Sequence, residues 1–241
     1  MTTRSRIKLR VAGDREELRR LAAEAIARKI HSAVDARGIC SLALSGGTTP
    51  GPVYEELGNS DLAAKLPWAQ IQIFFADERA VPMDHPDSNY RLVAETLLKS
   101  HPEAMGQMFR MPADAPDREQ AAKRYGRRLP DPLDVLVLGM GADGHTASLF
   151  PGSAALDERE VRVVSVVAPK PPPQRMTITP GVIERARSII MIAAGAEKAP
   201  MVSRALGGFT DPKVIPAQLA RRALWIVDQA AAGDLGASKR E

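Results

Sequence analysis

The residues best suited to chemistry lie in the middle of the chain, in the segment 135–151 with the sequence VLVLGMGADGHTASLFP. An apolar run from Val135 to Leu138 ends in a glycine-rich turn that encloses Asp143 and leads to His145. A histidine side chain has an ordinary pKa of about 6.5, so it can take up and return a proton at physiological pH. A carboxylate two residues away can orient such a base. The segment therefore indicates a candidate site for acid–base catalysis.

The apolar run reads as a buried strand, and the glycines read as the tight turn at its carboxyl end. In open α/β sheets, ligands bind at the carboxyl ends of the strands. This position favours a functional role for the turn. The alternative is a purely structural turn, in which His145 only caps a helix.

The three glycines at 139, 141 and 144 also match the pattern GxGxxG of dinucleotide-binding turns. That pattern requires a long helix after the third glycine, within a βαβ unit of roughly 30 residues. Here Pro151 and Gly152 follow closely and predict a break, and the motif lies past the middle of the chain. A nicotinamide site is therefore disfavoured, and no cofactor is expected.

A second glycine-rich turn, SGGTTP at 45–50, follows the apolar strand expected at 39–44. Glycines and hydroxyl residues between a strand and the start of a helix present backbone N–H groups to an anion such as phosphate. The segment lacks the GK[ST] ending of a P-loop. An ordinary strand–helix turn is the alternative, although such a turn would not need the three hydroxyl groups.

Further charged residues follow two other expected strands. Asp77, Glu78 and Arg79 end the strand expected at 71–76, where three charges are costly unless they are solvated, paired or used. Lys170 and Arg175 flank a run of prolines that stiffens its loop, so they can meet an anion at little ordering cost. A rigid connector with incidental charges is the alternative for this loop.

The elements that must position these residues alternate between strands and helices. We expect strands at 7–11, 39–44, 71–76, 133–138, 162–167, 188–194 and 223–227, with MFRM at 108–111 as a further short strand. Helices are expected from Asp14 to Gly38, from about Val53, after a cap at Asp87 or Ser88, within 117–129, at the end of 177–186, and after Gly195 to Leu206. This order predicts a three-layer, mostly parallel, Rossmann-like α/β sheet in a single domain spanning residues 1–241.

The composition fits this class. The chain has 241 residues, 44% hydrophobic and 26% charged, with a net charge of +4. These are ordinary values for a soluble globular domain. Acidic residues are interspersed with the basic ones, so nucleic acid is not an expected partner. A basic pocket for a small anionic substrate accounts for the charge excess equally well.

The cysteine count and the hydropathy exclude other classes. Cys40, the only cysteine, reads as a buried core thiol, which excludes an internal disulfide and a multi-cysteine metal site. No stretch reaches the roughly 18 consecutive apolar residues of a membrane span. The start MTTRSRIKLR lacks the apolar region of a signal peptide, so a cytoplasmic location is expected. His31, His85 and His101 read as surface or loop residues.

Together these motifs resemble a known family. SGGTTP, FFADERAVPMDHPDSNY and LGMGADGHTASLFPGS, followed by KPPPQRMT and AAGAEKA, are similar to the motifs of the 6-phosphogluconolactonases of the pentose phosphate pathway. The resemblance spans about residues 39–206 in the family's order. The related glucosamine-6-phosphate deaminases share GxGxDGH but continue with an apolar pair, Asn and Glu, whereas this chain continues with TASLF.

The resemblance implies a fold like that of the deaminases, the ribose-5-phosphate isomerases and the CoA-transferases. It also implies hydrolysis of 6-phospho-D-glucono-1,5-lactone, with His145 as the base. Asp143 would orient His145 or the water, and Arg79 would steady the oxyanion or the phosphate. The expected substrate-binding residues are Ser45, Gly46, Gly47, Thr48, Thr49, Asp77, Gly144, Lys170 and Arg175. No metal is expected, and the chain is expected to be a monomer or a weak homo-oligomer.

Two other functions remain open. One is a deaminase-like enzyme, which the missing Glu disfavours. The other is a non-catalytic sugar-phosphate sensing domain of the kind found in some transcription regulators. Such regulators carry a helix-turn-helix segment, for which the short stretch before the first expected strand leaves no room.

Overall fold

A computed structural model describes residues 7–235 and contains a six-stranded sheet in which every neighbouring pair runs parallel. In spatial order its strands are β1 (Lys8–Ala12), β9 (Leu224–Asp228), β8 (Ser188–Ala193), β5 (Val135–Gly139), β2 (Cys40–Leu44) and β3 (Ile71–Phe75). From β2 the chain adds β3 on one side and later builds β5, β8 and β9 on the other. The direction of winding therefore changes between β2 and β5, where open α/β sheets form their ligand crevice.

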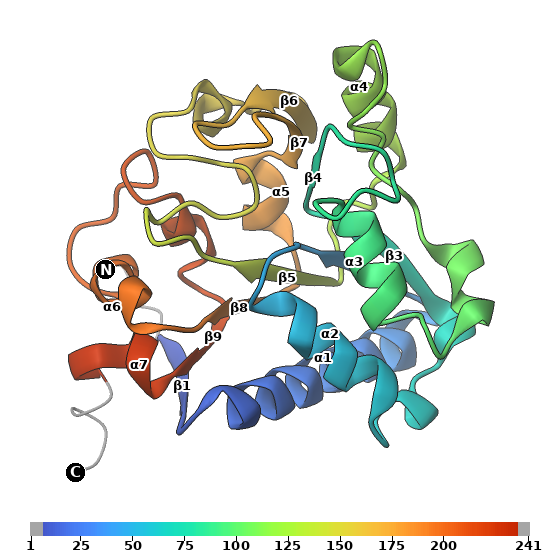
Figure 1. The fold of residues 1–241 in the computed structure, drawn as a ribbon, viewed down its shortest axis with the longest axis horizontal. Helices are drawn as coiled ribbons and strands as arrows, with labels where there is room; N and C mark the ends of the chain where they lie inside the picture. The colour runs from blue at the N-terminus through green and yellow to red at the C-terminus, as the bar shows by residue number, and fades with distance from the viewer. Residues whose placement is uncertain (1–6, 236–241) are drawn as a thin grey trace.

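Helices cover this sheet, which is why its central strands are continuously apolar. The α-helices of the whole described part of the chain, not all of which lie on this sheet, are α1 (Arg15–Arg37), α2 (Pro50–Asn59), α3 (Asn89–Thr96), α4 (Arg118–Arg128), α5 (Pro180–Arg185), α6 (Ala199–Leu206) and α7 (Gln229–Ala232). In Figure 1, α1 and α2 lie below the sheet, and α5 lies above it. Every side chain of β2 is buried. The predicted three-layer, mostly parallel α/β class is confirmed.

The first long helix, α1, begins and ends where Asp14 and Gly38 predict. The Asp14 carboxylate accepts the backbone N–H of Glu17 at 2.8 Å and so caps the amino end of α1. Gly38 ends the helix with a φ of 75°, in the left-handed region. The apolar face between them, with Leu18, Ile26 and Ile30 fully buried, packs α1 onto the sheet.

A second, antiparallel sheet was not predicted. It consists of β4 (Asp77–Arg79), β7 (Gln174–Ile178) and β6 (Val163–Val167), in the order β4-β7-β6. The expected proline loop after residue 168 is therefore shorter than predicted, because Arg175 lies on β7 rather than in the loop. The charged residues after β3, for which no strand was predicted, likewise form a strand. Both segments gain a hydrogen-bonded partner that is distant in sequence.

Other differences are local. The segment 108–111 was wrongly predicted as a strand: Met108 forms only an isolated bridge with Ile73, and its neighbour Phe109 stacks on Phe74 with ring centroids 4.8 Å apart. Of the two candidate caps for α3, Ser88 is the one used, and its hydroxyl accepts the N–H of Arg91 at 3.2 Å.

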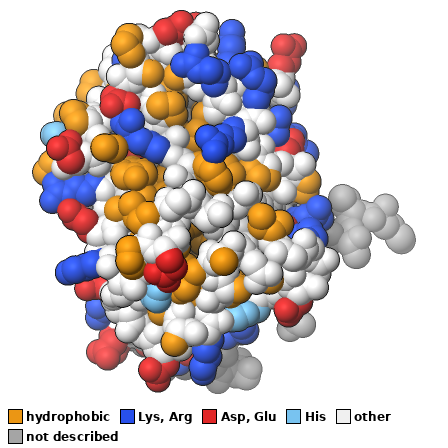
Figure 2. All heavy atoms as spheres, turned by 90° about the vertical axis from the view of Figure 1, so that its right-hand side faces the viewer, with side chains coloured by type: hydrophobic (Ala, Val, Ile, Leu, Met, Phe, Trp, Pro, Cys, Tyr) orange, Lys and Arg blue, Asp and Glu red, His pale blue; other side chains and the backbone are white. Residues whose placement is uncertain are grey.

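Part of the positive charge lies apart from the sheet crevice. Figure 2 shows Lys and Arg side chains gathered at the upper end of one face, where Figure 1 places α4. Lys123, Arg124 and Arg127 of this helix are exposed. Among residues 7–235, no helix is long and apolar enough to cross a membrane. A single domain over residues 1–241 stays a prediction.

Candidate active site

A cavity opens at the point where the winding of the sheet changes direction, between the carboxyl ends of β2 and β5. Its walls come from the turn after β2, from β4, from the turn after β5, and from β7 and the segment after β8. The lining residues are Ser45, Gly46, Gly47, Thr48, Thr49, Pro50, Asp77, Arg79, Gly139, Met140, Gly141, His145, Ala147, Arg175 and Lys198. The site is thus assembled from both sheets.

The turn after β2 forms the wall beside α2. Pro50 begins α2, so the preceding residues place their backbone at the positive end of that helix. The Ser45 carbonyl is fixed by the hydroxyl of the buried Tyr54, which donates to it over 2.6 Å. The Ser45 hydroxyl is buried and has no hydrogen-bond partner among the described residues. An unsatisfied hydroxyl on a cavity wall is suited to a polar ligand.

The turn after β5 carries the predicted acid–base pair. Gly141 permits it, because a Cβ at this position would lie 2.0 Å from the Nδ1 atom of His145. The Nδ1 atom of His145 contacts the Oδ1 atom of Asp143, and the imidazole stacks on Phe150 with centroids 4.6 Å apart. The ring is therefore held at its Nδ1 edge and on one face, and its Nε2 atom has no hydrogen-bond partner among the described residues.

Asp143 is a fixed negative charge. Burial raises its pKa, but the hydrogen bond and charge of His145 and the charge of Lys170 outweigh burial and hold the pKa well below its usual range. The Lys170 Nζ atom lies 3.7 Å from the Asp143 Oδ2 atom and 3.4 Å from the His145 Nδ1 atom. A protonated lysine and a protonated Nδ1 cannot share a hydrogen bond. The Asp143 carboxylate is ionised and lies closer to the His145 Nδ1 atom than the Lys170 Nζ atom does. We therefore assign the Nδ1–H donor to Asp143, and Lys170 pairs with the same carboxylate.

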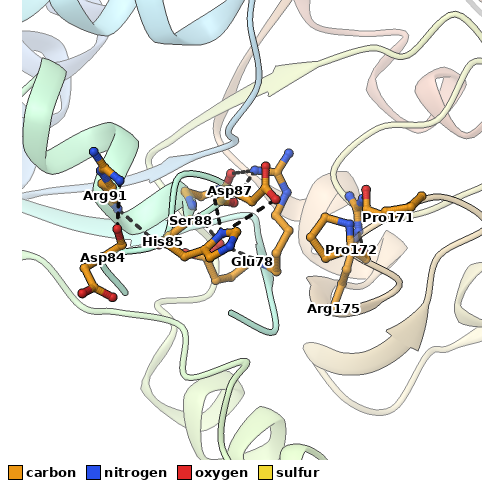
Figure 3. A network of polar contacts seen from close by, with 11 residues as sticks. Glu78, Asp84, His85, Asp87, Ser88, Arg91, Pro171, Pro172 and Arg175 are labelled. Atoms are coloured by element: carbon orange, nitrogen blue, oxygen red, sulfur yellow. Dashed lines mark hydrogen bonds and ion pairs between the residues drawn. The ribbon is translucent and has the colours of Figure 1, made fainter. Parts of the chain in front are cut away.

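Arg79 and Arg175 face one another across the antiparallel pair β4–β7. Like charges directly opposite each other on a sheet destabilise it unless a counter-charge is present. Arg175 is buried, and its guanidinium is fixed by the carbonyls of Pro172 at 2.9 Å and Pro171 at 3.3 Å (Figure 3). Burial lowers the pKa of Arg175, the Asp77 charge raises it, and the Arg79 charge lowers it. Two cations on one cavity wall indicate an anionic ligand.

Asp77 lines the same cavity as these two arginines. Its Oδ2 atom accepts the hydroxyl of Ser148 at 2.7 Å, and its Oδ1 atom accepts the Asn89 amide at 3.3 Å. The Asn89 side chain in turn accepts from the Arg79 guanidinium at 2.6 Å. All of these side chains except Arg79 are buried. Asp77 is thus a positioned carboxylate that still lines the cavity.

The neighbouring carboxylate of Glu78 has a structural task. It accepts the backbone N–H groups of Asn89 and Tyr90, each at 2.8 Å, and so holds the amino end of α3 against β4. Burial raises the pKa of Glu78, and these N–H groups lower it. This contact fixes the start of the helix from which Asn89 reaches Asp77 and Arg79.

Sequence reasoning missed Lys198 as a site residue. Lys198 ends the short 3-10 helix Ala196–Lys198 after β8, lines the cavity, and donates from Nζ to the Thr49 hydroxyl at 3.2 Å. Burial lowers its pKa, while the charges of Glu197 and Asp228 raise it. The segment AAGAEKA was noted only for its resemblance; its place after a strand and a glycine was the signal that could have identified Lys198.

The structure brings most of the predicted residues together. Ser45, Gly46, Gly47, Thr48, Thr49, Asp77, Arg79, His145 and Arg175 line one cavity, and Asp143 contacts His145. Asp143 itself and two further predicted residues, Gly144 and Lys170, do not line the cavity. Gly144 packs against Met201 and Ile215, and Lys170 meets Asp143. Within residues 7–235 no group of three or more His, Cys, Asp or Glu side chains could hold a metal ion.

The fold and the cavity define an α/β enzyme with a histidine–carboxylate pair and cationic walls for a small anionic substrate. Residues 13–227 match the family described as glucosamine-6-phosphate isomerases/6-phosphogluconolactonase. A 6-phosphogluconolactonase from Synechocystis sp. is 36% identical over 223 residues, covering 87% of this chain and 90% of the relative. The chain belongs to this family.

Solved structures agree with this assignment. The 6-phosphogluconolactonase from Trypanosoma brucei is similar with a TM-score of 0.83 and 30% identity, covering 95% of this chain and 99% of that protein. A monomeric glucosamine-6-phosphate deaminase of the NagB superfamily has a TM-score of 0.80 at 23% identity, covering 94% and 99%. That second likeness shows the fold alone, and it confirms the predicted relationship to the deaminase fold.

Proposed function

We propose that the chain hydrolyses 6-phospho-D-glucono-1,5-lactone to 6-phosphogluconate, the second step of the oxidative pentose phosphate pathway. The observation that carries the proposal is the Asp143–His145 pair at the carboxyl end of β5, in a cavity whose other walls carry Arg79, Arg175 and Lys198. The lactone has an electrophilic carbonyl at one end and a phosphate at the other. The cavity offers a base and separate cationic groups that suit both ends. The family membership supports this choice of substrate.

His145 acts as the base. With the Nδ1–H group donating a hydrogen bond to Asp143, the Nε2 atom of the neutral imidazole is free to accept a proton from water. The resulting hydroxide forms a bond to the lactone carbonyl carbon, and the carbonyl electrons move onto its oxygen. When this tetrahedral intermediate collapses, the bond between that carbon and the ring oxygen breaks. The ring oxygen takes the proton back from Nε2, so the products are the acid and a neutral histidine.

Arg79 and Arg175 stabilise the negative charge that forms on the carbonyl oxygen. The nearness of Arg175 to His145 supports this role, because the Arg175 guanidinium carbon lies 5.6 Å from the centre of the Phe150 ring, on which His145 also stacks. Arg79 faces Arg175 across the β4–β7 pair. A fixed guanidinium costs no reorganisation as the charge develops. We therefore propose a role for Arg175 at the reacting carbon, whereas the sequence alone favoured a role at the phosphate.

The phosphate binds to the turn after β2 and to Lys198. The backbone N–H groups at the amino end of α2 and the hydroxyls of Thr48 and Thr49 form the neutral part of this site. Lys198, already held against Thr49, supplies the positive charge. A lysine–phosphate hydrogen bond is charge-assisted and roughly twice as strong as a neutral one.

Asp77 and Lys170 complete the proposal. Asp77 accepts a hydrogen bond from a sugar hydroxyl, which orients the ring between the phosphate site and His145. Lys170 acts through Asp143, because its Nζ atom meets that carboxylate rather than the cavity. We further propose a cytoplasmic setting and a monomer or weak homo-oligomer, to be measured by fractionation and by light scattering.

The test is hydrolysis of freshly generated 6-phosphoglucono-δ-lactone, followed by proton release and compared with its spontaneous opening. We expect strong acceleration by the wild-type chain. Ammonia release from glucosamine 6-phosphate is measured in parallel. Ammonia release without lactone hydrolysis would contradict the proposal and favour the deaminase reaction. Binding of sugar phosphates without either reaction would favour a sensing domain.

A further inference from the structure

Asp228, at the carboxyl end of β9, is a buried carboxylate outside the cavity. Both of its oxygens accept the backbone N–H of Gly195, each at 3.1 Å, and Oδ1 also accepts the N–H of Ala231 at 2.7 Å. The Ala231 contact caps α7. The Gly195 contact joins two segments that are 33 residues apart in sequence.

The turn that Asp228 holds leads directly to Lys198. Gly195 precedes the single 3-10 turn Ala196–Lys198, and the Lys198 N–H donates back to the Gly195 carbonyl at 3.1 Å. From the end of this turn the Lys198 side chain reaches the Thr49 hydroxyl on the cavity wall. The backbone position of Lys198 therefore depends on Gly195, whose N–H group is fixed by Asp228.

We propose that Asp228 is a positioning residue for substrate binding, which holds the Gly195 turn so that Lys198 meets the substrate phosphate. This inference rests on the proposed function of Lys198. A carboxylate that only capped α7 would need one oxygen on the Ala231 N–H. Asp228 instead uses both oxygens on the Gly195 N–H, and this second contact connects the cap of α7 to the binding site.

The charge of Asp228 acts on the same lysine. Burial lowers the pKa of Lys198, and the carboxylates of Glu197 and Asp228 oppose this, while Arg15 adds to the lowering. Arg15 also lies 4.0 Å from Asp228, with its side chain largely exposed. Asp228 thus fixes the position of Lys198 and favours its charged form.

The inference predicts an effect on KM rather than on kcat. Lys198→Met removes a charge-assisted hydrogen bond, and we expect KM to rise about 10- to 100-fold. Asp228→Ala keeps the lysine but frees its turn, and we expect KM to rise about five- to tenfold. kcat stays within about twofold in both variants, since neither residue contacts His145 or Asp143. Asp228→Asn keeps one oxygen acceptor, and we expect a KM rise of about threefold.

A matched control separates positioning from stability. Asp134 is also a buried carboxylate, and it accepts the N–H and hydroxyl of Ser41 at 2.9 Å each, beside the amino end of β5 and away from the cavity. Asp134→Asn is expected to lower stability and leave KM unchanged. A double-mutant cycle completes the test: in the Lys198→Met background, Asp228→Ala should raise KM no further, because the group it positions is gone.

Three results would overturn the inference: a KM for Asp228→Ala within about twofold of wild type, an equal rise in Asp134→Asn, or additive effects of Asp228→Ala and Lys198→Met. Should Asp228→Ala not fold, Asp228→Asn is judged by the same KM criterion. If the wild-type chain does not hydrolyse the lactone, the proposed function fails separately. Inorganic phosphate binding, measured by calorimetry on wild type and Asp228→Asn, then decides: weaker binding in the variant supports the inference, and equal binding contradicts it.

Discussion

Gly46 lies where the turn after β2 meets Asn89, and replacing it by alanine is expected to disturb Asp77 and Arg79 of the cavity wall, which Asn89 holds. A Cβ on residue 46 would lie 1.7 Å from Asn89 Oδ1 and 2.4 Å from its Cγ, where ordinary contact begins near 3.4 Å. Asn89 is fully buried, so its amide cannot move aside freely. The substitution must therefore break the contacts that this amide makes.

The magnitude follows from those contacts. Asn89 accepts from Arg79 at 2.6 Å and donates to the Asp77 carbonyl at 2.8 Å. A hydrogen bond to a charged group contributes about 1.5–3 kcal/mol and a neutral one about 1 kcal/mol, so Gly46→Ala should lower the free energy of unfolding by about 2–4 kcal/mol. Displacing Arg79 and Asp77 by about 1 Å should lower kcat/KM about 100-fold.

Urea unfolding and lactone kinetics on purified Gly46→Ala measure both quantities. Gly106→Ala is the matched control, because a Cβ at residue 106 meets no atom within 4 Å. We expect the control to be close to wild type. A Gly46→Ala protein with wild-type stability and wild-type kcat/KM would refute the inference that the close approach of Gly46 to Asn89 keeps Asp77 and Arg79 in place.

Three further predictions address single groups. Burial and the nearby Asp134 charge raise the pKa of Cys40 to about 12. The thiol should therefore resist Ellman's reagent at pH 8 in the folded protein and react once urea unfolds the chain. Rapid labelling of the folded protein would contradict the burial of Cys40. Burial lowers the pKa of Lys198, so this lysine loses its charge at a lower pH than an ordinary lysine. The Kd for 6-phosphogluconate, measured by calorimetry, should therefore rise as the pH becomes alkaline. This rise should be absent in Lys198→Arg, because the guanidinium keeps its charge. Lys170→Met should lower kcat several-fold more than it raises KM, since Lys170 contacts Asp143 rather than the cavity; an effect on KM alone would instead return Lys170 to the phosphate site.

The sequence predicted what local signals determine. The Asp14 and Gly38 caps, the continuously buried strand Cys40–Leu44 and the turn that carries Asp143 and His145 each depend on residues close together in the chain. Such signals fixed the parallel α/β class and the ends of its main elements. They also predicted that Asp143 and His145 lie at the crevice, because strand ends of a parallel sheet meet at one edge.

The remainder depends on contacts distant in sequence. The β4–β7 pairing joins residues about 100 positions apart, so neither segment alone revealed the second sheet or the facing of Arg79 and Arg175. Asn89 read only as part of a helix start, yet its amide connects Asp77 and Arg79. Gly144 does not line the cavity, and a Cβ on it would lie 3.1 Å from Met201 and Ile215; the spacing of the motif could not distinguish this side of the turn from the cavity side.

The role of His145 as the base is measured by comparing kcat/KM for the lactone in wild type, His145→Ala and His31→Ala. His31 lies on α1, away from the cavity, and controls for the loss of a histidine as such. We predict that His145→Ala loses 100-fold or more, as expected for removal of a general base, while His31→Ala keeps wild-type activity. A His145→Ala protein that retains near-normal turnover would contradict the central claim that His145 activates the attacking water.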